Sequence, residues 1–76
     1  MSWATTSERT NAGYKIFVAV PVTDDTEIVI GYKQTSLGDQ YVCWFANEGG
    51  YYWGKYCHTY RDALMYLKER LETYLR

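Results

Sequence analysis

The chain has 76 residues and a formal net charge of −1, so it can form one small domain and has no excess of basic residues to attract nucleic acid or an anionic membrane. It contains no apolar run near the roughly 20 residues of a membrane-spanning helix, and its first residues lack the basic and apolar stretches of a signal peptide. We therefore expect a cytoplasmic protein without a membrane partner, in which both cysteines are free thiols.

Residues 1–13 are polar, rich in threonine and serine, and show no periodicity of apolar residues. They are predicted to form a flexible N-terminal tail that ends at Asn11-Ala12-Gly13, and residues 14–76 are predicted to form a single α+β domain. Trp3 is the exception within the tail. We expect it either to contact the domain or a partner, or to belong to a disordered end.

Four segments rich in β-branched and aromatic residues predict strands, at residues 14–20, 27–33, 40–46 and 51–57. Residues that favour turns separate the segments, with Asp24 and Asp25 in the first connection and Gly49 and Gly50 in the last. Because each connection is short, the simplest topology is a four-stranded antiparallel meander in the order of the sequence.

Residues 60–75 are predicted to form a helix, because their apolar residues recur on one side. Thr59 is a suitable N-cap, and Asp62 three positions later extends the capping pattern. At 1.5 Å per residue the helix is about 24 Å long, enough to cover one face of the sheet. The predicted fold is therefore α+β, a ββββα chain with one helix packed on one face. The apolar arc comprises Tyr60, Ala63, Leu64, Leu67, Leu71, Tyr74 and Leu75.

The predicted hairpin of residues 40–57 has large aromatic residues on both faces. If Ala46 pairs with Tyr51, strict alternation separates two sets of side chains. One face then carries Val42, Trp44, Ala46, Tyr51, Trp53 and Lys55. The other face contains the small residues Cys43 and Gly54, which suit close packing of the helix. It carries Tyr41, Cys43, Phe45, Tyr52, Gly54 and Tyr56.

A single helix covers one face, so the other aromatic face is expected to be open, and an open aromatic face is typical of a contact surface. We predict a partner-binding surface formed by Val42, Trp44, Tyr51 and Trp53, with Lys55 at its rim. Two structural alternatives stay open. Cross-strand aromatic pairs stabilise a small sheet without any partner, and the N-terminal tail could fold over this face.

The sequence shows no arrangement typical of an enzyme or a metal site. Cys43 and Cys57 lie on opposite faces in the predicted register, which disfavours a disulfide. Together with His58 they offer three metal ligands, without the usual spacing and without a fourth ligand. His58 also lacks the cleft and the third group that a Cys–His nucleophile requires. We therefore predict no cofactor, no metal and no catalytic residue, and we expect both thiols to be buried.

The order of a hairpin followed by a helix, with Gly54-Lys55-Tyr56 leading into Thr59 and Ala63, resembles in outline the three-stranded-sheet DNA-binding modules of some integrases. The resemblance covers residues 39–75 and implies contact between a sheet face and nucleic acid. Those modules depend on basic residues along the open sheet, whereas this chain offers mainly Lys55 there, with Lys33 or Lys15 as further candidates.

These observations favour a small non-enzymatic protein-interaction module, such as an accessory or inhibitor protein of a phage or mobile element, that binds another protein through the aromatic sheet face. One alternative is a homodimeric structural domain in which two open faces pack together. A second alternative is a sheet-face nucleic-acid binder, whose affinity would fall steeply with salt. An aromatic protein contact would change little with salt.

Overall fold

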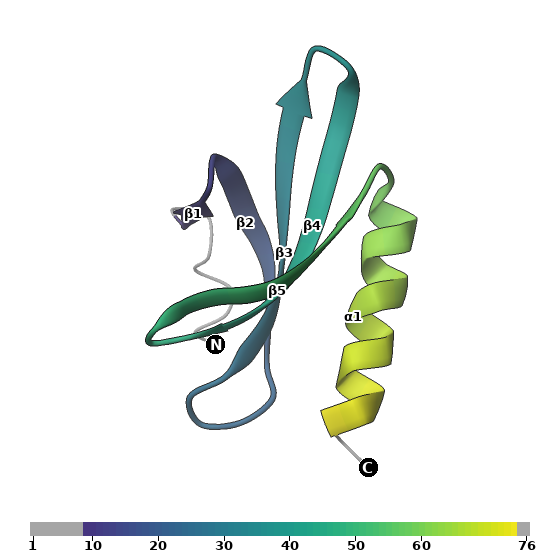
Figure 1. The fold of residues 1–76 in the computed structure, drawn as a ribbon. Helices are drawn as coiled ribbons and strands as arrows, with labels where there is room; N and C mark the ends of the chain where they lie inside the picture. Colours follow the sequence, from purple (N-terminus) through teal and green to yellow (C-terminus); the bar gives the residue numbers. More distant parts are fainter. Residues whose placement is uncertain (1–8, 75–76) are drawn as a thin grey trace.

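The computed structural model describes residues 9–74. Its five strands form one antiparallel sheet in the order β1-β2-β3-β4-β5, and a C-terminal helix packs on one side of that sheet (Figure 1). This is the predicted α+β meander, enlarged by one strand. Trp3 and Leu75 lie outside the described residues. The elements are β1 (Thr10–Asn11), β2 (Tyr14–Pro21), β3 (Glu27–Thr35), β4 (Gly38–Asn47), β5 (Gly50–Cys57) and α1 (Tyr60–Tyr74).

The additional strand, β1, lies inside the segment that was predicted to be a tail, so the prediction of four strands was wrong by one. A turn at Ala12 and Gly13, both at positive φ, folds β1 back onto the start of β2. The backbone amide of Ile16 also donates to the carbonyl oxygen of Arg9 at 3.0 Å. A two-residue strand has no side-chain periodicity, and the sequence pattern therefore gave no signal for it.

The hairpin of β3 and β4 is longer than predicted, because its strands remain paired as far as Thr35 and Gly38. The Thr35 hydroxyl organises the turn: it donates to the Gly38 carbonyl oxygen at 2.7 Å and accepts from the Leu37 amide at 3.1 Å. The connection expected over residues 34–39 is thereby reduced to two residues. The hairpin projects beyond the rest of the sheet (Figure 1). The Leu37 side chain in its turn is 97% exposed.

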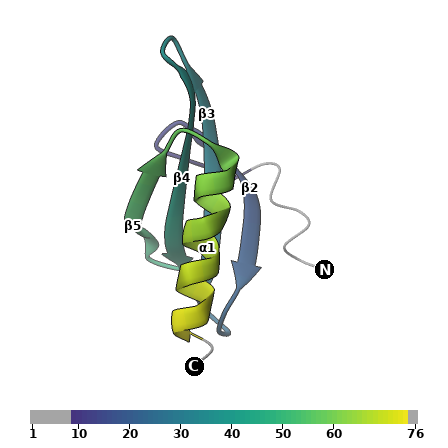
Figure 2. The ribbon, with the colours of Figure 1, turned by 90° about the vertical axis from the view of Figure 1, so that its right-hand side faces the viewer.

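Helix α1 begins as predicted, with the Thr59 hydroxyl accepting a hydrogen bond from the Asp62 amide at 3.1 Å. Ala63 and Leu67 are buried on the predicted apolar arc, and Leu71 is half-buried. The helix lies in front of the central strands β3 and β4, with β2 and β5 on either side (Figure 2). It packs against β3, β4 and β5, whereas Phe17 of β2 and Trp53 of β5 stay exposed on this side.

The core beneath the helix is formed by β3, β4, β5 and α1. Both cysteines belong to it and are buried, as predicted. Cys57 lies on the same side of the sheet as Cys43, however, so the prediction of opposite faces was wrong. The buried members of this core beneath the helix are Ile28, Ile30, Cys43, Cys57, Ala63 and Leu67.

The side of the sheet opposite the helix, which was predicted to be open, is a second buried core. Trp44 lies at its centre, 5.7 Å from the perpendicular ring of Tyr14. The indole packs directly over two glycines: a Cβ atom at Gly31 would lie 3.0 Å from Trp44 Cζ3, and one at Gly54 would lie 2.7 Å from Trp44 Nε1. The members of this core are at most 5% exposed, and they are Tyr14, Ile16, Ala19, Val29, Val42, Trp44 and Ala46.

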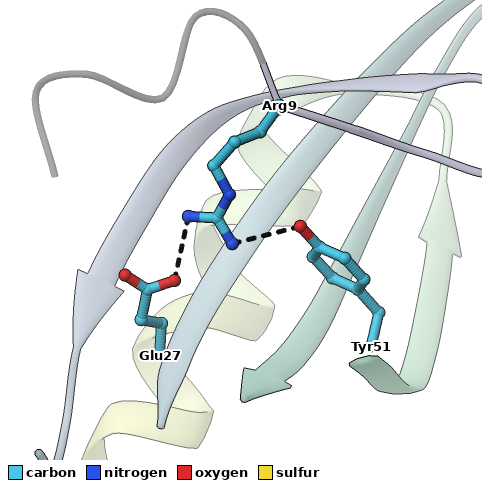
Figure 3. A network of polar contacts seen from close by, with 3 residues as sticks. All are labelled: Arg9, Glu27 and Tyr51. Atoms are coloured by element: carbon cyan, nitrogen blue, oxygen red, sulfur yellow. Dashed lines mark hydrogen bonds and ion pairs between the residues drawn. The ribbon is translucent and has the colours of Figure 1, made fainter. Parts of the chain in front are cut away.

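This second core is closed because the sheet curls until its two margins meet. The rings of Tyr14 in β2 and Tyr56 in β5 lie 6.1 Å apart. Arg9 donates from Nη1 to Glu27 Oε1 at 2.9 Å and from Nη2 to Tyr51 Oη at 3.1 Å (Figure 3). Burial alone lowers the pKa of Arg9, but its hydrogen bonds to Tyr51 and Glu27 raise that pKa above its usual value. The guanidinium therefore stays charged while it joins the two margins.

Candidate functional site

The five residues predicted to form one partner-binding surface lie on two sides of the sheet. Val42 and Trp44 are buried in the core opposite the helix, and Tyr51 is half-buried beside them. Trp53 is 76% exposed on the helix side. Lys55 is also on the helix side, with its Nζ 5.3 Å from the centre of the Tyr66 ring. The predicted surface therefore does not exist as a single patch.

A β-bulge at Trp53 separates these residues. The predicted register holds at the end of the hairpin, where Phe45 pairs with Tyr52, but the next paired residues are Cys43 and Lys55. Two residues of β5 thus oppose one residue of β4. Trp53 occupies the bulge with φ of 57°, in the left-handed region. Beyond the bulge every side chain of β5 is on the face opposite to the one predicted.

The bulge suits the packing of Trp44. With the register shifted, the residue of β5 that faces the Trp44 indole is Gly54, which has no side chain to collide with it. Without the shift, Trp53 would have to share the closed core with Trp44. The shift instead places Trp53 on the helix side, where its ring stands perpendicular to that of Phe45 at 5.5 Å.

Arg70 of α1 binds the backbone of β4 and β5 at the bulge. It donates from Nη1 to the Cys43 carbonyl oxygen at 2.9 Å and from Nη2 to the Trp53 carbonyl oxygen at 2.6 Å. Its guanidinium also lies 4.8 Å from the centre of the Phe45 ring. A bulge interrupts the hydrogen-bonded ladder, and the guanidinium fork supplies donors to both strands at that point.

Arg70 was not among the residues predicted to form the site, although a signal for it was present in the sequence. At about 100° per residue, Arg70 lies about 20° from Ala63 around the helix. It was therefore a charged residue at the margin of the apolar arc, from which contact with the sheet could have been expected.

An aromatic groove lies between the bulge and the end of the helix, and we call it the Trp53 groove. It encloses a cavity of about 310 Å³. The Phe45 ring forms its floor, with the Tyr74 ring 5.4 Å away on the helix. Trp53, Tyr52 and Tyr74 are all exposed large aromatic side chains. The lining residues are Thr26, Phe45, Asn47, Tyr52, Trp53 and Tyr74.

A second aromatic pocket, of about 290 Å³, lies at the other flank of the helix, near its first turn. A second bulge, in β2 next to Phe17, turns that ring toward the helix side. The Phe17 and Tyr60 rings lie 5.4 Å apart, and Tyr41 and Tyr60 lie 5.9 Å apart. The pocket is lined by Lys15, Phe17, Tyr32, Tyr41 and Tyr60.

Both thiols are buried, free cysteines with raised pKa values. Burial raises the pKa of Cys43 to about 11, and burial followed by the charge of Asp62 raises the pKa of Cys57. Both thiols are therefore neutral near pH 7, whereas a nucleophilic cysteine requires its thiolate. Among residues 9–74, no group of three or more histidine, cysteine, aspartate and glutamate side chains is placed to hold a metal ion.

No protein-family model, no curated protein and no solved structure matches the chain. Within the described part of the chain, α1 is too short and too polar to cross a membrane.

Proposed function

We propose that this chain is a non-enzymatic protein-interaction module that binds a partner protein through the Trp53 groove. The observation that supports this most directly is the exposure of the Trp53 side chain on a fixed backbone. Its side chain is 76% exposed, although its backbone is fixed by the bulge and by the hydrogen bond from Arg70. A large aromatic side chain is thus held in solvent by an ordered framework.

The conformation of Trp53 is unfavourable for the fold alone. A bulky residue in the left-handed region costs about 1–2 kcal/mol relative to glycine. The exposed ring recovers little of this through burial, because the side chain is 76% exposed. Glycine or asparagine would serve the bulge at least as well. A contact with a partner explains why tryptophan is found there, since tryptophan is among the commonest anchors of protein interfaces.

Contact through side chains is favoured over addition of a strand at the sheet edge. β5 is an edge strand, and its bulge distorts the row of backbone groups that an incoming strand would need. The nucleic-acid alternative gains no support, because two candidate cations are engaged by aromatic rings. Lys33 Nζ lies 5.1 Å from the centre of the Tyr14 ring, and Lys55 lies over Tyr66.

The test is capture of a partner by wild-type protein and by the Trp53→Ala variant, with the folded state of each verified by circular dichroism. Leu37→Ala is the matched control, because Leu37 is also a large apolar residue, is even more exposed than Trp53, and lies at the tip of the β3–β4 hairpin. We expect Trp53→Ala to lose the partner and Leu37→Ala to retain it. Equal capture by both folded variants would assign binding to another surface.

Light scattering across a wide concentration range separates this proposal from the homodimer alternative. We expect a monomer at every concentration. A dimer that dissociates in the Trp53→Ala variant would mean that a second copy fills the groove, and the proposal would be wrong.

A further inference from the structure

The second inference rests on the proposed function and concerns the chemistry of the partner. We propose that the Trp53 groove receives a basic segment of the partner protein. In this arrangement a lysine or arginine side chain lies along Trp53 and Tyr52, with its cation at the carboxylates of Asp25 and Glu48.

The aromatic groove continues into an acidic hollow. Asn47 and Tyr52 line the Trp53 groove and also line an adjoining cavity of about 410 Å³, together with Asp25, Glu48 and Gly49. A ligand that extends along Tyr52 from the groove therefore reaches two carboxylates. The β2–β3 connection and the tip of the β4–β5 hairpin supply one each.

Neither Asp25 nor Glu48 forms an ion pair within residues 9–74. Arg9 lines a neighbouring cavity together with both of them, but its ion pair is with Glu27. The Arg70 guanidinium donates to two carbonyl oxygens and forms no ion pair with either carboxylate. The acidic hollow thus presents carboxylates without an ion-pair partner beside aromatic rings, a combination that favours cations and repels carboxylates and phosphates.

Asp25 is held in place by its own loop. Both hydroxyl groups that contact it, those of Thr23 and Thr26, donate to the same oxygen, Oδ1, at 2.9 and 3.2 Å. Among the described residues, none donates a hydrogen bond to the second carboxylate oxygen, Oδ2. The loop therefore fixes the carboxylate without consuming its second oxygen, so that a partner's ammonium or guanidinium can bind there.

The side chain that suits this site is long and cationic. Lysine and arginine lay their methylene stems along apolar surfaces and place the charge beyond them. Tryptophan is the aromatic ring with the strongest attraction for a cation. The molecule contains an internal example of such a contact, since the Arg70 guanidinium lies 4.8 Å from the centre of the Phe45 ring. A neighbouring apolar side chain of the same segment would occupy the cavity among Phe45, Trp53 and Tyr74.

The test uses three synthetic nine-residue peptides with the same central leucine, flanked by lysine and arginine, by serine, or by aspartate and glutamate. Binding is followed through the indole N–H resonance of Trp53 and through its neighbours in the groove. We expect the basic peptide to bind at least ten-fold more tightly than the serine peptide at 50 mM salt. This preference should shrink as salt rises.

Two charge variants show where the preference originates. Asp25→Asn with Glu48→Gln removes two negative charges beside the groove and keeps the oxygen that accepts from Thr23. Glu69→Gln with Glu72→Gln removes the same charge from the exposed face of α1 and is the matched control. We expect the first pair to abolish the preference for the basic peptide and the second pair to leave it within about two-fold.

The outcomes distinguish this inference from the proposed function. If the serine or acidic peptide binds at the Trp53 groove as tightly as the basic peptide, the partner is not basic and only this inference is wrong. If no peptide perturbs Trp53, and no captured partner depends on Trp53, both proposals are wrong. Equal loss of binding in both charge variants would also overturn the assignment to Asp25 and Glu48.

Discussion

The two sides of the sheet use aromatic residues in opposite ways. Opposite the helix, Tyr14 and Trp44 are each 5% exposed in a core that the sheet closes by its own curvature. On the helix side, α1 packs against β3, β4 and β5, and Phe17 and Trp53 stand exposed on either side of the helix. Both flanking residues lie at bulges. Aromatic content alone therefore does not reveal a contact surface, because its meaning depends on curvature and register.

The largest expected difference in stability appears when one tryptophan on each side of the sheet is replaced by alanine. Trp44→Ala removes the centre of the closed core, and we expect a loss of about 3–5 kcal/mol in the free energy of unfolding. For a domain of this size that loss is close to the whole stability, so the variant should be largely unfolded at 25 °C. Trp53→Ala should cost about 1 kcal/mol or less, since the Trp53 side chain is 76% exposed.

Urea denaturation followed by circular dichroism measures both free energies. Similar losses for Trp44→Ala and Trp53→Ala would mean that Trp53 also belongs to a core, which would remove the contrast between the sides. A folded and stable Trp44→Ala protein would show that the closed side contributes less than its burial indicates.

The sequence predicted much of the fold because local patterns and the tertiary structure agree. Alternating β-branched and aromatic residues marked the four longer strands, and Thr59 marked the start of α1. The hairpin end was also predicted correctly, since Ala46 pairs with Tyr51. Short connections were sufficient to give the antiparallel order. These features depend on neighbours in the sequence.

The candidate site could not be predicted in the same way, because one inserted residue reverses a whole face. The pattern from Tyr51 to Cys57 is compatible with strict alternation, and the shift at Trp53 depends on the room that Trp44 needs beside Gly54. Closure of the other side depends on curvature and on Arg9, which lies far from Tyr51 in the sequence. Such contacts exist only after the chain has folded. Trp53 was predicted as a contact residue, and that role stays a prediction.

The next largest effect tests what holds the bulge on the helix side. Arg70→Met keeps the apolar stem but removes the donors to the carbonyl oxygens of Cys43 and Trp53. We expect a loss of about 2 kcal/mol, because hydrogen bonds from a charged donor are lost together. The Trp53 indole resonance should also broaden or shift. Denaturation and two-dimensional NMR measure the two effects.

Two control variants make this result specific. Lys68→Met removes a positive charge from the exposed face of α1 and should change stability by less than about 0.5 kcal/mol. Arg70→Lys should be intermediate, since an ammonium cannot reproduce the planar fork. If Arg70→Met is as stable as wild type, the bulge is maintained by packing alone.

The core beneath the helix can be tested by pH. The Cys43 pKa of about 11 lies above the value of 9.0 for an unburied thiol, and the cause is burial. Below pH 9 the thiol is neutral in the folded and unfolded states alike. As pH rises from 9 to 11 the unfolded state ionises first, so stability should fall, by up to about 1.4 kcal/mol per pH unit.

Denaturation at pH 8, 9 and 10 measures this fall, and Cys43→Ala is the control. Cys57 and Tyr14 also have raised pKa values, so the control should lose stability over the same range, but less steeply. An identical slope in the two proteins would show that Cys43 does not contribute.

The smallest effect bears most directly on why Trp53 is exposed. In an ordinary strand alanine is more stable than glycine by about 0.5–1 kcal/mol, because glycine loses more backbone entropy on folding. At a left-handed position the order reverses, since a Cβ atom collides with the backbone. We therefore expect Trp53→Gly to be about 1 kcal/mol more stable than Trp53→Ala, although both lack the ring.

The neighbouring residue supplies the control for this reversal. Tyr52 pairs regularly with Phe45 and lies outside the left-handed region, so Tyr52→Gly should be less stable than Tyr52→Ala. The same sign at both positions would mean that Trp53 is an ordinary strand residue, and its exposure would need no partner to explain it. Opposite signs would mean that the fold tolerates an unfavourable tryptophan where glycine would serve better. If Trp53→Gly also lost the partner, stability would favour glycine at this position and binding would favour tryptophan.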